Sequence, residues 1–401
     1  AWGFAYSFPF SQVVGLTTIL GFIFYKDKGR FPINGLSMLL VLFVFWMTLT
    51  TLFALNPTQA WPEWDRAMKI QLISFLTILL MQDPQRIRQL IWVIALSLGF
   101  YGVKGGVFAI VTAGEYLVWG PKETFIGDNN TLAMALLMTL PLMRFCQMDA
   151  ANVWIKRAWT GGMMLTFVSI LVSHSRGALV GIAATLMFVW WKSKRKAIGV
   201  VLALIALPFV VAFLPDHWFD RMSTISEYEQ DASALGRINA WWFAFNLAMD
   251  RPLVGGGFRT FKDHLFLKYA PNPADVHDAH SIYFEVLGEH GFVGLALFLG
   301  IGLLALRYTG RLAKTEFSGQ DLQWIPRLAA LLQISLVSYA ATGAFLGLAY
   351  FDLYYQIVAI VIVLNVLAAK YVSAESEVKV GQGMRAAGQV RSAEPINDRS
   401  Y

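Results

Sequence analysis

HDAHSIYFEVLGEHGFVGLALFLGIGLLAL, residues 277–306, begins with three histidines and three acids and ends in an uninterrupted apolar run. A helix needs about 20 mainly apolar residues to cross a bilayer. The stretch therefore predicts a membrane-spanning helix whose first turns carry titratable side chains. Two questions follow: how many such helices the chain has, and on which side of the membrane these groups lie.

The composition is that of a membrane protein. Of the 401 residues, 57% are hydrophobic and only 14% are charged, whereas soluble domains have about 25% charged residues. Long continuous apolar segments favour helices, because barrel strands would show short alternating segments of about 10 residues. We predict an all-α, polytopic integral membrane protein. Its expected spans are 10–25, 35–54, 68–82, 87–113, 131–146, 158–173, 177–191, 197–214, 281–306, 328–345 and 352–370.

Four regions follow from these eleven expected spans. Residues 1–214 hold the N-terminal transmembrane helices, 215–280 one large loop with amphipathic helices, and 281–370 the C-terminal transmembrane helices. Residues 371–401 are small, polar and charged, and we expect a disordered tail. The sequence starts at Ala1 within what resembles a helix edge, so a twelfth helix is expected in the native chain.

The distribution of basic residues predicts the orientation. Alternate connections and the tail contain 21 of the 32 lysines and arginines, and the other connections contain 10. Cytoplasmic loops carry the excess of basic residues. The tail is therefore expected in the cytoplasm, and the large loop and the start of the 281–306 span outside it. No ATP is available there, so an enzyme on that side needs a donor that is already activated and carried by a lipid, or it carries out hydrolysis.

Two arginines are candidate anion ligands at this outer face. Arg176, in SHSRGALVG, lies between two spans that are joined by a minimal turn. Arg237 lies in the first turns of an expected surface helix, DASALGRINAWWFAFNLAMD, whose paired tryptophans suit a membrane interface. A guanidinium group matches phosphate as a fork. The simpler interpretation is that both arginines contact lipid headgroups. His174 is a candidate supporting residue.

His280 is the candidate catalytic base, because it stands where the loop meets the helix and titrates near neutral pH. The simpler interpretation is a histidine that caps the helix. Glu285 and Glu289 are expected on different sides of the helix from His280, so that no pair is preformed. His277 and His290 are expected at the surface.

Further supporting candidates are Asp278, Arg259 and Lys104. Asp278 either orients the His280 imidazole or caps the helix. Lys104 lies inside a span, where a lysine usually faces a wet cavity, unless it lies near the helix end. The single cysteine, Cys146, excludes an intrachain disulfide, and no Cys/His cluster has the spacing of a metal site.

Several of these motifs together resemble the bacterial O-antigen ligase family. His280-Ser281, nine residues, Gly291, two residues and Gly294 resemble that family's signature. RPLVGGGFRTF, from Arg251, resembles the Pro-Leu-x-Gly-x-Gly turn of the wider ligase and polymerase superfamily, and SHSRGALVG resembles its arginine-bearing helix start. WGFAYSFPF and GDNNTLAMAL resemble the exosortase-associated O-glycosylation ligases.

The resemblance implies a glycosyltransferase of the bacterial inner membrane with its active site facing the periplasm. The donor would be a glycan on undecaprenyl pyrophosphate, and the acceptor a sugar hydroxyl of lipid A-core, in lipopolysaccharide biosynthesis. His280 matches the catalytic base, and Arg176 and Arg237 match the arginines that hold pyrophosphate. No metal, cofactor or nucleic acid is expected.

Two other functions stay open at this stage. An O-antigen polymerase or a protein O-oligosaccharyltransferase would use the same donor with a different acceptor. A transporter of lipid-linked sugars would line a path through the membrane with its basic residues. The basic residues that are not cytoplasmic cluster at the outer face, with only Lys104 inside a span, which favours an enzyme with a one-sided site.

Overall fold

The computed structural model describes residues 10–26, 29–193, 195–197, 232–317 and 319–392, and within these ranges the chain forms helices and loops without a β-strand. All but the first residue of the expected span 197–214, and the first part of the large loop, 215–231, lie outside the described residues. The helices are α2 (Phe10–Phe24), α3 (Gly35–Leu52), α4 (Pro57–Leu80), α5 (Pro84–Val111), α6 (Asn129–Asp149), α7 (Val153–Val172), α8 (Arg176–Lys192), α11 (Ala232–Asp250), α12 (Asp263–Tyr269), α13 (Ile282–Leu312), the 3₁₀ turn η1 (Gln320–Leu322), α14 (Trp324–Gly343) and α15 (Asp352–Ser392).

Short polar side chains fix where many of the helices begin. Asn34, Asp83, Asp128, Asn152 and Ser175 precede α3, α5, α6, α7 and α8, and each accepts a hydrogen bond from a backbone N–H of the first turn. The first N–H groups of a helix have no partner inside it, so such a cap stabilises the helix by about 1 kcal/mol. Three of the caps, Asp83, Asn152 and Ser175, end turns of only three residues between neighbouring helices.

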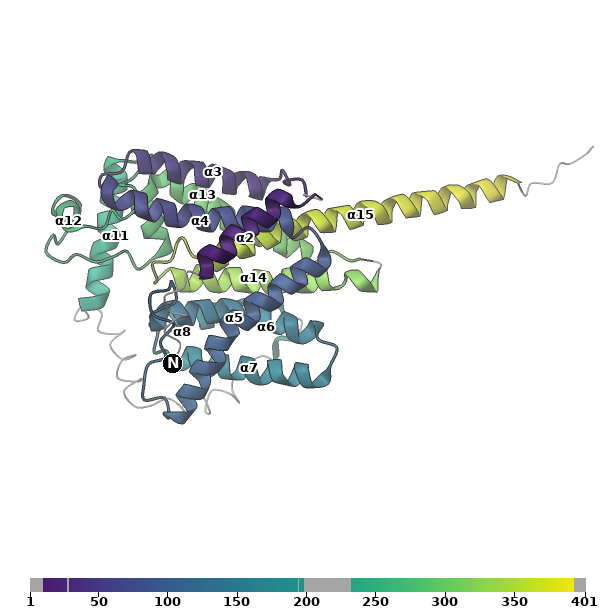
Figure 1. Ribbon diagram of the computed structural model, residues 1–401, viewed down its shortest axis with the longest axis horizontal. Coiled ribbons are helices and arrows are strands. Elements are labelled where there is room, and N and C mark those ends of the chain that lie inside the picture. The colour runs from purple at the N-terminus through teal and green to yellow at the C-terminus, as the bar shows by residue number, and fades with distance from the viewer. Residues whose placement is uncertain (1–9, 27–28, 194, 198–231, 318, 393–401) are drawn as a thin grey trace, which may run out of the picture.

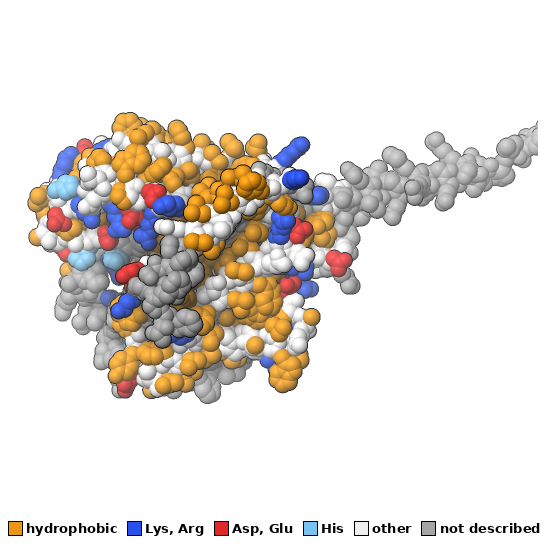
Figure 2. Space-filling model, viewed as in Figure 1, with side chains coloured by type: hydrophobic (Ala, Val, Ile, Leu, Met, Phe, Trp, Pro, Cys, Tyr) orange, Lys and Arg blue, Asp and Glu red, His pale blue; other side chains and the backbone are white. Residues whose placement is uncertain are grey.

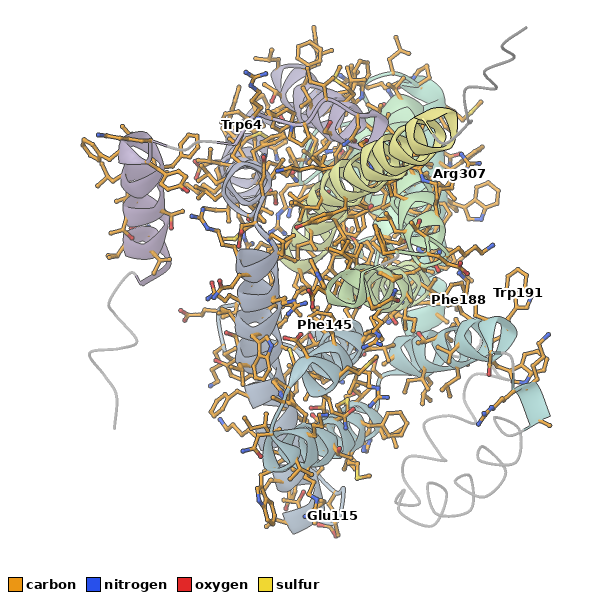
Figure 3. The ribbon with its side chains drawn as sticks, turned by 90° about the vertical axis from the view of Figure 1, so that its right-hand side faces the viewer. Trp64, Glu115, Phe145, Phe188, Trp191 and Arg307 are labelled. Atoms are coloured by element: carbon orange, nitrogen blue, oxygen red, sulfur yellow. The ribbon has the colours of Figure 1, made fainter. Side chains whose placement is uncertain are left out.

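The long helices lie side by side in one bundle, in which α6 is enclosed by its neighbours (Figure 1). α6 packs against α5, α7, α8 and α14, and most of its residues are buried. Figure 3 shows Phe145 of α6 between the helices and Trp191 of α8 at the outside. α2 lies at the edge of the bundle, where it contacts α4.

Small residues bring α5 and α7 together. A Cβ atom at Gly102 or Gly105 would lie 2.4 Å from the hydroxyl oxygen of Thr166 or Ser169, and one at Gly106 would lie 2.1 Å from the Leu165 carbonyl oxygen. Association of helices in a membrane depends on close packing, because lipid is as apolar as the side chains. The glycines therefore let the two backbones approach.

The surface has the pattern of a protein that spans a membrane. Apolar side chains cover the sides of the bundle, and lysine, arginine and acidic side chains gather towards its two ends (Figure 2). The helices that are long and apolar enough to cross a membrane are α3, α5, α6, α13, α14 and the first part of α15, Asp352–Ser373. The protein is thus a multi-pass α-helical membrane protein, as the sequence predicts.

The other helices at expected spans are shorter or more polar. α8 has 17 residues and α2 has 15. α4 begins at Pro57, well before the expected residue 68, so its first turns are charged. The number of spans therefore stays a prediction.

The C-terminal segment differs from the expectation of disorder after residue 370, because α15 continues to Ser392. The segment contains helix-favouring alanine, glutamate and glutamine residues but also three glycines and four valines, and it projects away from the bundle (Figure 1).

α11 and α12 lie across the end of the bundle opposite the α15 projection (Figure 1); we call this end the site end. On α11, Leu235, Ile238, Trp242 and Phe245 are exposed, and they share one face. The opposite face packs against α12 and α13. The exposed apolar stripe agrees with the helical periodicity of the sequence and is typical of a helix in the membrane interface, a location that stays a prediction.

A kink in α13 receives the glycine-rich turn that follows α11. Gly291 has φ 67°, so the regular hydrogen bonding of the helix breaks there. The N–H of Phe292 donates to the Pro252 carbonyl at 2.9 Å, and the carbonyls of Gly288 and Glu289 accept from the N–H groups of Gly256 and Gly257, each at 2.8 Å. The two motifs are separate in the sequence, and in the fold they bind each other.

Cysteine labelling tests the orientation. In a Cys146→Ala background, an impermeant thiol reagent on intact spheroplasts should label Ala274→Cys, at the site end, and should label Glu316→Cys, between α13 and α14, only after lysis. The reason is the excess of basic residues at the Glu316 end. The reverse labelling would contradict the orientation.

Candidate active site

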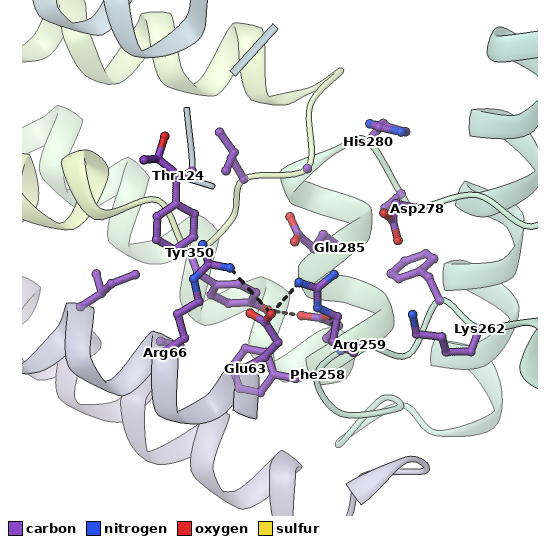
Figure 4. Close-up of a pocket in the computed structure, with 18 residues that line it drawn as sticks. Glu63, Arg66, Thr124, Phe258, Arg259, Lys262, Asp278, His280, Glu285 and Tyr350 are labelled. Carbon is purple, nitrogen blue, oxygen red and sulfur yellow. Dashed lines mark hydrogen bonds and ion pairs between the residues drawn. The ribbon is translucent and has the colours of Figure 1, made fainter. Parts of the chain in front are cut away.

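The site end contains two neighbouring cavities. The first, of about 60 Å³, is lined by Arg176 and Arg237 with Asn130, His174, Ser175, Gly177, Thr342, Phe345 and Leu346; we call it the arginine cavity. The second, of about 280 Å³, is lined by side chains of both charges, among them Glu63, Arg66, Arg259, Lys262, Asp278, His280, Glu285, Glu289 and Tyr350; we call it the mixed cavity (Figure 4).

The structure brings the two predicted arginines together. Arg176 is the first residue of α8, directly after the N-cap Ser175, and Arg237 lies in the second turn of α11. They come from segments far apart in the sequence and line the same small cavity. His174 lines it as well, is buried, and has φ 54°, a conformation that side chains other than glycine rarely adopt.

His280 lies just before α13 and lines the mixed cavity. α11 holds the backbone next to His280 in place, because the indole N–H of Trp241 donates to the carbonyl of the preceding residue, Ala279, at 2.8 Å. Arg237 stands one helical turn before Trp241 and so lies on the same side of α11. This packing places a cation of the arginine cavity near His280.

Electrostatics favour a neutral imidazole at His280. Burial lowers its pKa from the usual value, and the positive charge of Arg237 lowers it further, whereas Asp278 and Asp128 act in the opposite direction. No described residue hydrogen-bonds to the imidazole. The interpretation of His280 as a helix cap is therefore wrong, since the N-cap is Ser281. A neutral, half-buried imidazole beside a cavity is suited to accept a proton.

The supporting candidates have different positions. Arg259 lines the mixed cavity, where its guanidinium binds Glu63 at 2.5 Å and its backbone N–H donates to Glu289 at 2.8 Å. Asp278 lines the same cavity but forms no hydrogen bond to His280 or to the helix N-terminus. Lys104 is exposed on α5 and lines neither cavity, so it lies apart from the site.

His290 contradicts the expectation of a surface residue. It is fully buried, and its two ring nitrogens lie 2.6 Å from the Thr50 hydroxyl and 2.8 Å from the Tyr350 hydroxyl. Tyr350 also donates to Glu289 at 2.6 Å. Burial raises the pKa of Tyr350 well above its usual value, and the nearby Glu289 raises it further, so the phenol keeps its proton. The resulting chain of polar groups ties α3, α13 and the α14–α15 connection together beneath the mixed cavity.

Three more residues that line the mixed cavity are not predicted from the sequence: Glu63, Arg66 and Lys262. The first two stand in WPEWDRAMK, which precedes the expected span at residue 68, and the helix starts earlier than that. Glu63 bridges Arg66, at 3.8 Å, and Arg259, and the guanidinium of Arg66 lies 3.6 Å from the centroid of the Phe125 ring. The alternation of acidic and basic residues in that stretch is the sequence feature that indicates a polar site there.

The fold and these cavities define a multi-pass helical membrane protein with a polar site at one end of its bundle. Residues 161–299 match the model of the family described as O-antigen ligase, and residues 1–151 match that of a family of unknown function. No curated protein matches the chain. The first match includes Arg176, Arg237 and His280, and it confirms the resemblance of this part of the chain to the O-antigen ligase family, which supports a membrane glycosyltransferase of the ligase and polymerase type.

Tyr350→Phe tests the buried chain of polar groups. The substitution leaves Glu289 and His290 each without one hydrogen bond in a buried site, so the free energy of unfolding should fall by about 1–3 kcal/mol. Reversible unfolding in mixed micelles measures it. The exposed Tyr116→Phe is the matched control and should change little. Equal stability of both variants would show that the Tyr350 hydroxyl contributes nothing.

Proposed function

We propose that the protein transfers a glycan from undecaprenyl pyrophosphate to a sugar hydroxyl of lipid A-core at the periplasmic face of the bacterial inner membrane. The observation that carries the proposal is that His280 lines a cavity with room for a sugar and lies near enough to Arg237, which lines the neighbouring arginine cavity, for that positive charge to lower its pKa. A base next to an anion site is what transfer from a glycosyl pyrophosphate requires.

In the proposed reaction, the acceptor hydroxyl oxygen attacks the anomeric carbon of the donor sugar. The hydroxyl proton passes to the neutral imidazole of His280 while the new glycosidic bond forms. The bond between the anomeric carbon and the phosphate oxygen breaks, and its electron pair leaves with undecaprenyl pyrophosphate. Arg176 and Arg237 stabilise the negative charge that grows on that oxygen. The reaction needs no ATP, since the donor bond is already activated.

An apolar groove beside Arg237 supports this placement of the donor. Ile238, Trp241, Trp242, Phe245 and Phe284 line it, and its volume is about 350 Å³. Ile238 directly follows Arg237 along α11. A donor whose pyrophosphate binds the arginines can therefore place its polyprenyl chain on the apolar face of the same helix, at the membrane interface.

His280→Ala tests the role of the base. A general base typically contributes about 10²–10⁴-fold in rate, so the variant should insert and bind undecaprenyl pyrophosphate yet lose ligation by about that factor. The measurement is the transfer of a synthetic lipid-linked glycan to lipid A-core by pure protein. His277→Ala is the matched control, with an expected loss far smaller. Normal ligation by His280→Ala at normal abundance would refute the assignment.

The pH dependence tests the electrostatics around the base. Activity should fall as His280 becomes protonated, and the lowered pKa puts the midpoint of this fall below the usual histidine value of about 6.5. Arg237→Gln removes a charge that disfavours the imidazolium, so the midpoint should move to higher pH, whereas Asp278→Asn should move it to lower pH. Profiles of kcat/KM against pH measure both. Shifts in the same direction would contradict His280 as the titrating group.

A further inference from the structure

The two cavities differ in charge in a way that the donor does not explain. The arginine cavity has two guanidinium groups in its lining, and no described acidic residue lines it. The mixed cavity is lined by three cations and by carboxyl groups in similar number: Arg66, Arg259 and Lys262, and Glu63, Asp278, Glu285 and Glu289. The first lining suits a diphosphate. In the mixed cavity, the carboxylates would repel any further anion.

One segment of chain separates the two cavities. In the connection between α14 and α15, Phe345 and Leu346 line the arginine cavity, and Gly347, Leu348 and Tyr350 line the mixed cavity. A Cβ atom at Gly347 would lie 3.6 Å from the backbone nitrogen of His280. His280 therefore lies at the boundary, where groups that occupy the two cavities would meet.

Inside the mixed cavity, some polar groups are engaged and others are not. Glu63 binds Arg259 and Arg66, and Glu289 accepts from Tyr350 and from the Arg259 backbone. The side chains of Lys262 and Asp278, by contrast, form no hydrogen bond or ion pair with any described residue. Figure 4 shows both on one side of the cavity, with Asp278 nearer to His280 than Lys262 is. They supply one strong donor and one strong acceptor to a ligand.

We propose, on the basis of the transferase function above, that the mixed cavity is the acceptor site, and that it selects an uncharged sugar headgroup through Lys262 and Asp278. A sugar hydroxyl both donates and accepts hydrogen bonds, so it can accept from the Lys262 ammonium and donate to the Asp278 carboxylate. A phosphate group in the same place can only accept at neutral pH and would face Asp278 and Glu63. The acceptor is therefore a neutral sugar at its reacting end.

Binding to the full chain in lipid nanodiscs tests the proposal without requiring transfer. The probes are two synthetic lipids with the same tails, one with a neutral disaccharide headgroup and one with the same disaccharide bearing a phosphate. The neutral lipid should bind about 10-fold more tightly than the phosphorylated lipid. Asp278→Asn and Lys262→Met should each weaken binding of the neutral lipid by about 10-fold, the usual effect of losing a hydrogen bond to a charged group.

Matched controls are available on α12. Asp263 and Lys268 are exposed and do not line the cavity, so Asp263→Asn and Lys268→Met should bind the neutral lipid as the unchanged protein does. Undecaprenyl pyrophosphate reports on the donor cavity separately, and its binding should weaken for Arg176→Ala but not for Asp278→Asn.

Each remaining outcome overturns the acceptor assignment. The phosphorylated lipid could bind as tightly as the neutral lipid or more tightly, or neither lipid could bind. Asp278→Asn and Lys262→Met could leave binding of the neutral lipid unchanged. A serine-rich peptide could compete with the neutral lipid and bind more tightly than it does. Selective binding of the neutral lipid by a protein that transfers no glycan would instead refute the transferase function and leave the selectivity of the cavity intact.

Discussion

The docking of the glycine-rich turn into the kink of α13 is the contact on which the site end depends. A helix that crosses a membrane must satisfy its own backbone groups, and a break at Gly291 leaves the Gly288 and Glu289 carbonyls without their partners. Gly256 and Gly257 supply those N–H groups. A Cβ atom at Gly291 would lie 2.6 Å from the Leu253 carbonyl oxygen, so only glycine allows this approach. The turn thereby holds Phe258 and Arg259, which follow it, against the mixed cavity.

Backbone strain concentrates at the same end of the molecule. Among the described residues other than glycine, positive φ values occur at His174, Arg259 and His280, and also at Ala113 and Glu123. A residue held in this region costs about 1–3 kcal/mol, and such strain persists only where the surroundings fix it. For Arg259 the surroundings are Glu63 and Glu289, and for His280 they are the Trp241 bond and the buried Ser281. The fold therefore holds these side chains in place before any ligand binds.

The sequence predicts those parts of the site that are local, and it fails where the fold makes the contact. Apolar periodicity gives the helices, and the position of His280 before its helix follows from the end of the loop. His290 has the same local signal as a surface histidine, and only the packing of Thr50 and Tyr350 from distant helices shows that it is buried. Glu63 and Arg66 are likewise not predicted as site residues, because the apolar run starts at residue 68 and α4 begins earlier, at Pro57. No spacing in the sequence shows that two cavities form.

The apolar face of α11 explains why the site includes a large loop at all. Its exposed side can enter the membrane interface, while its other side carries Arg237 and the Trp241 bond to the residue before His280. A single helix thus fixes the position of Arg237 relative to that of His280, the proposed base. A pyrophosphate on a polyprenyl chain and a sugar on a lipid both lie at the headgroup level, so their reacting atoms can meet only at one depth. In the proposed reaction, the contact between α11 and the residue before His280 would place the proposed base at that depth without any movement of the bundle.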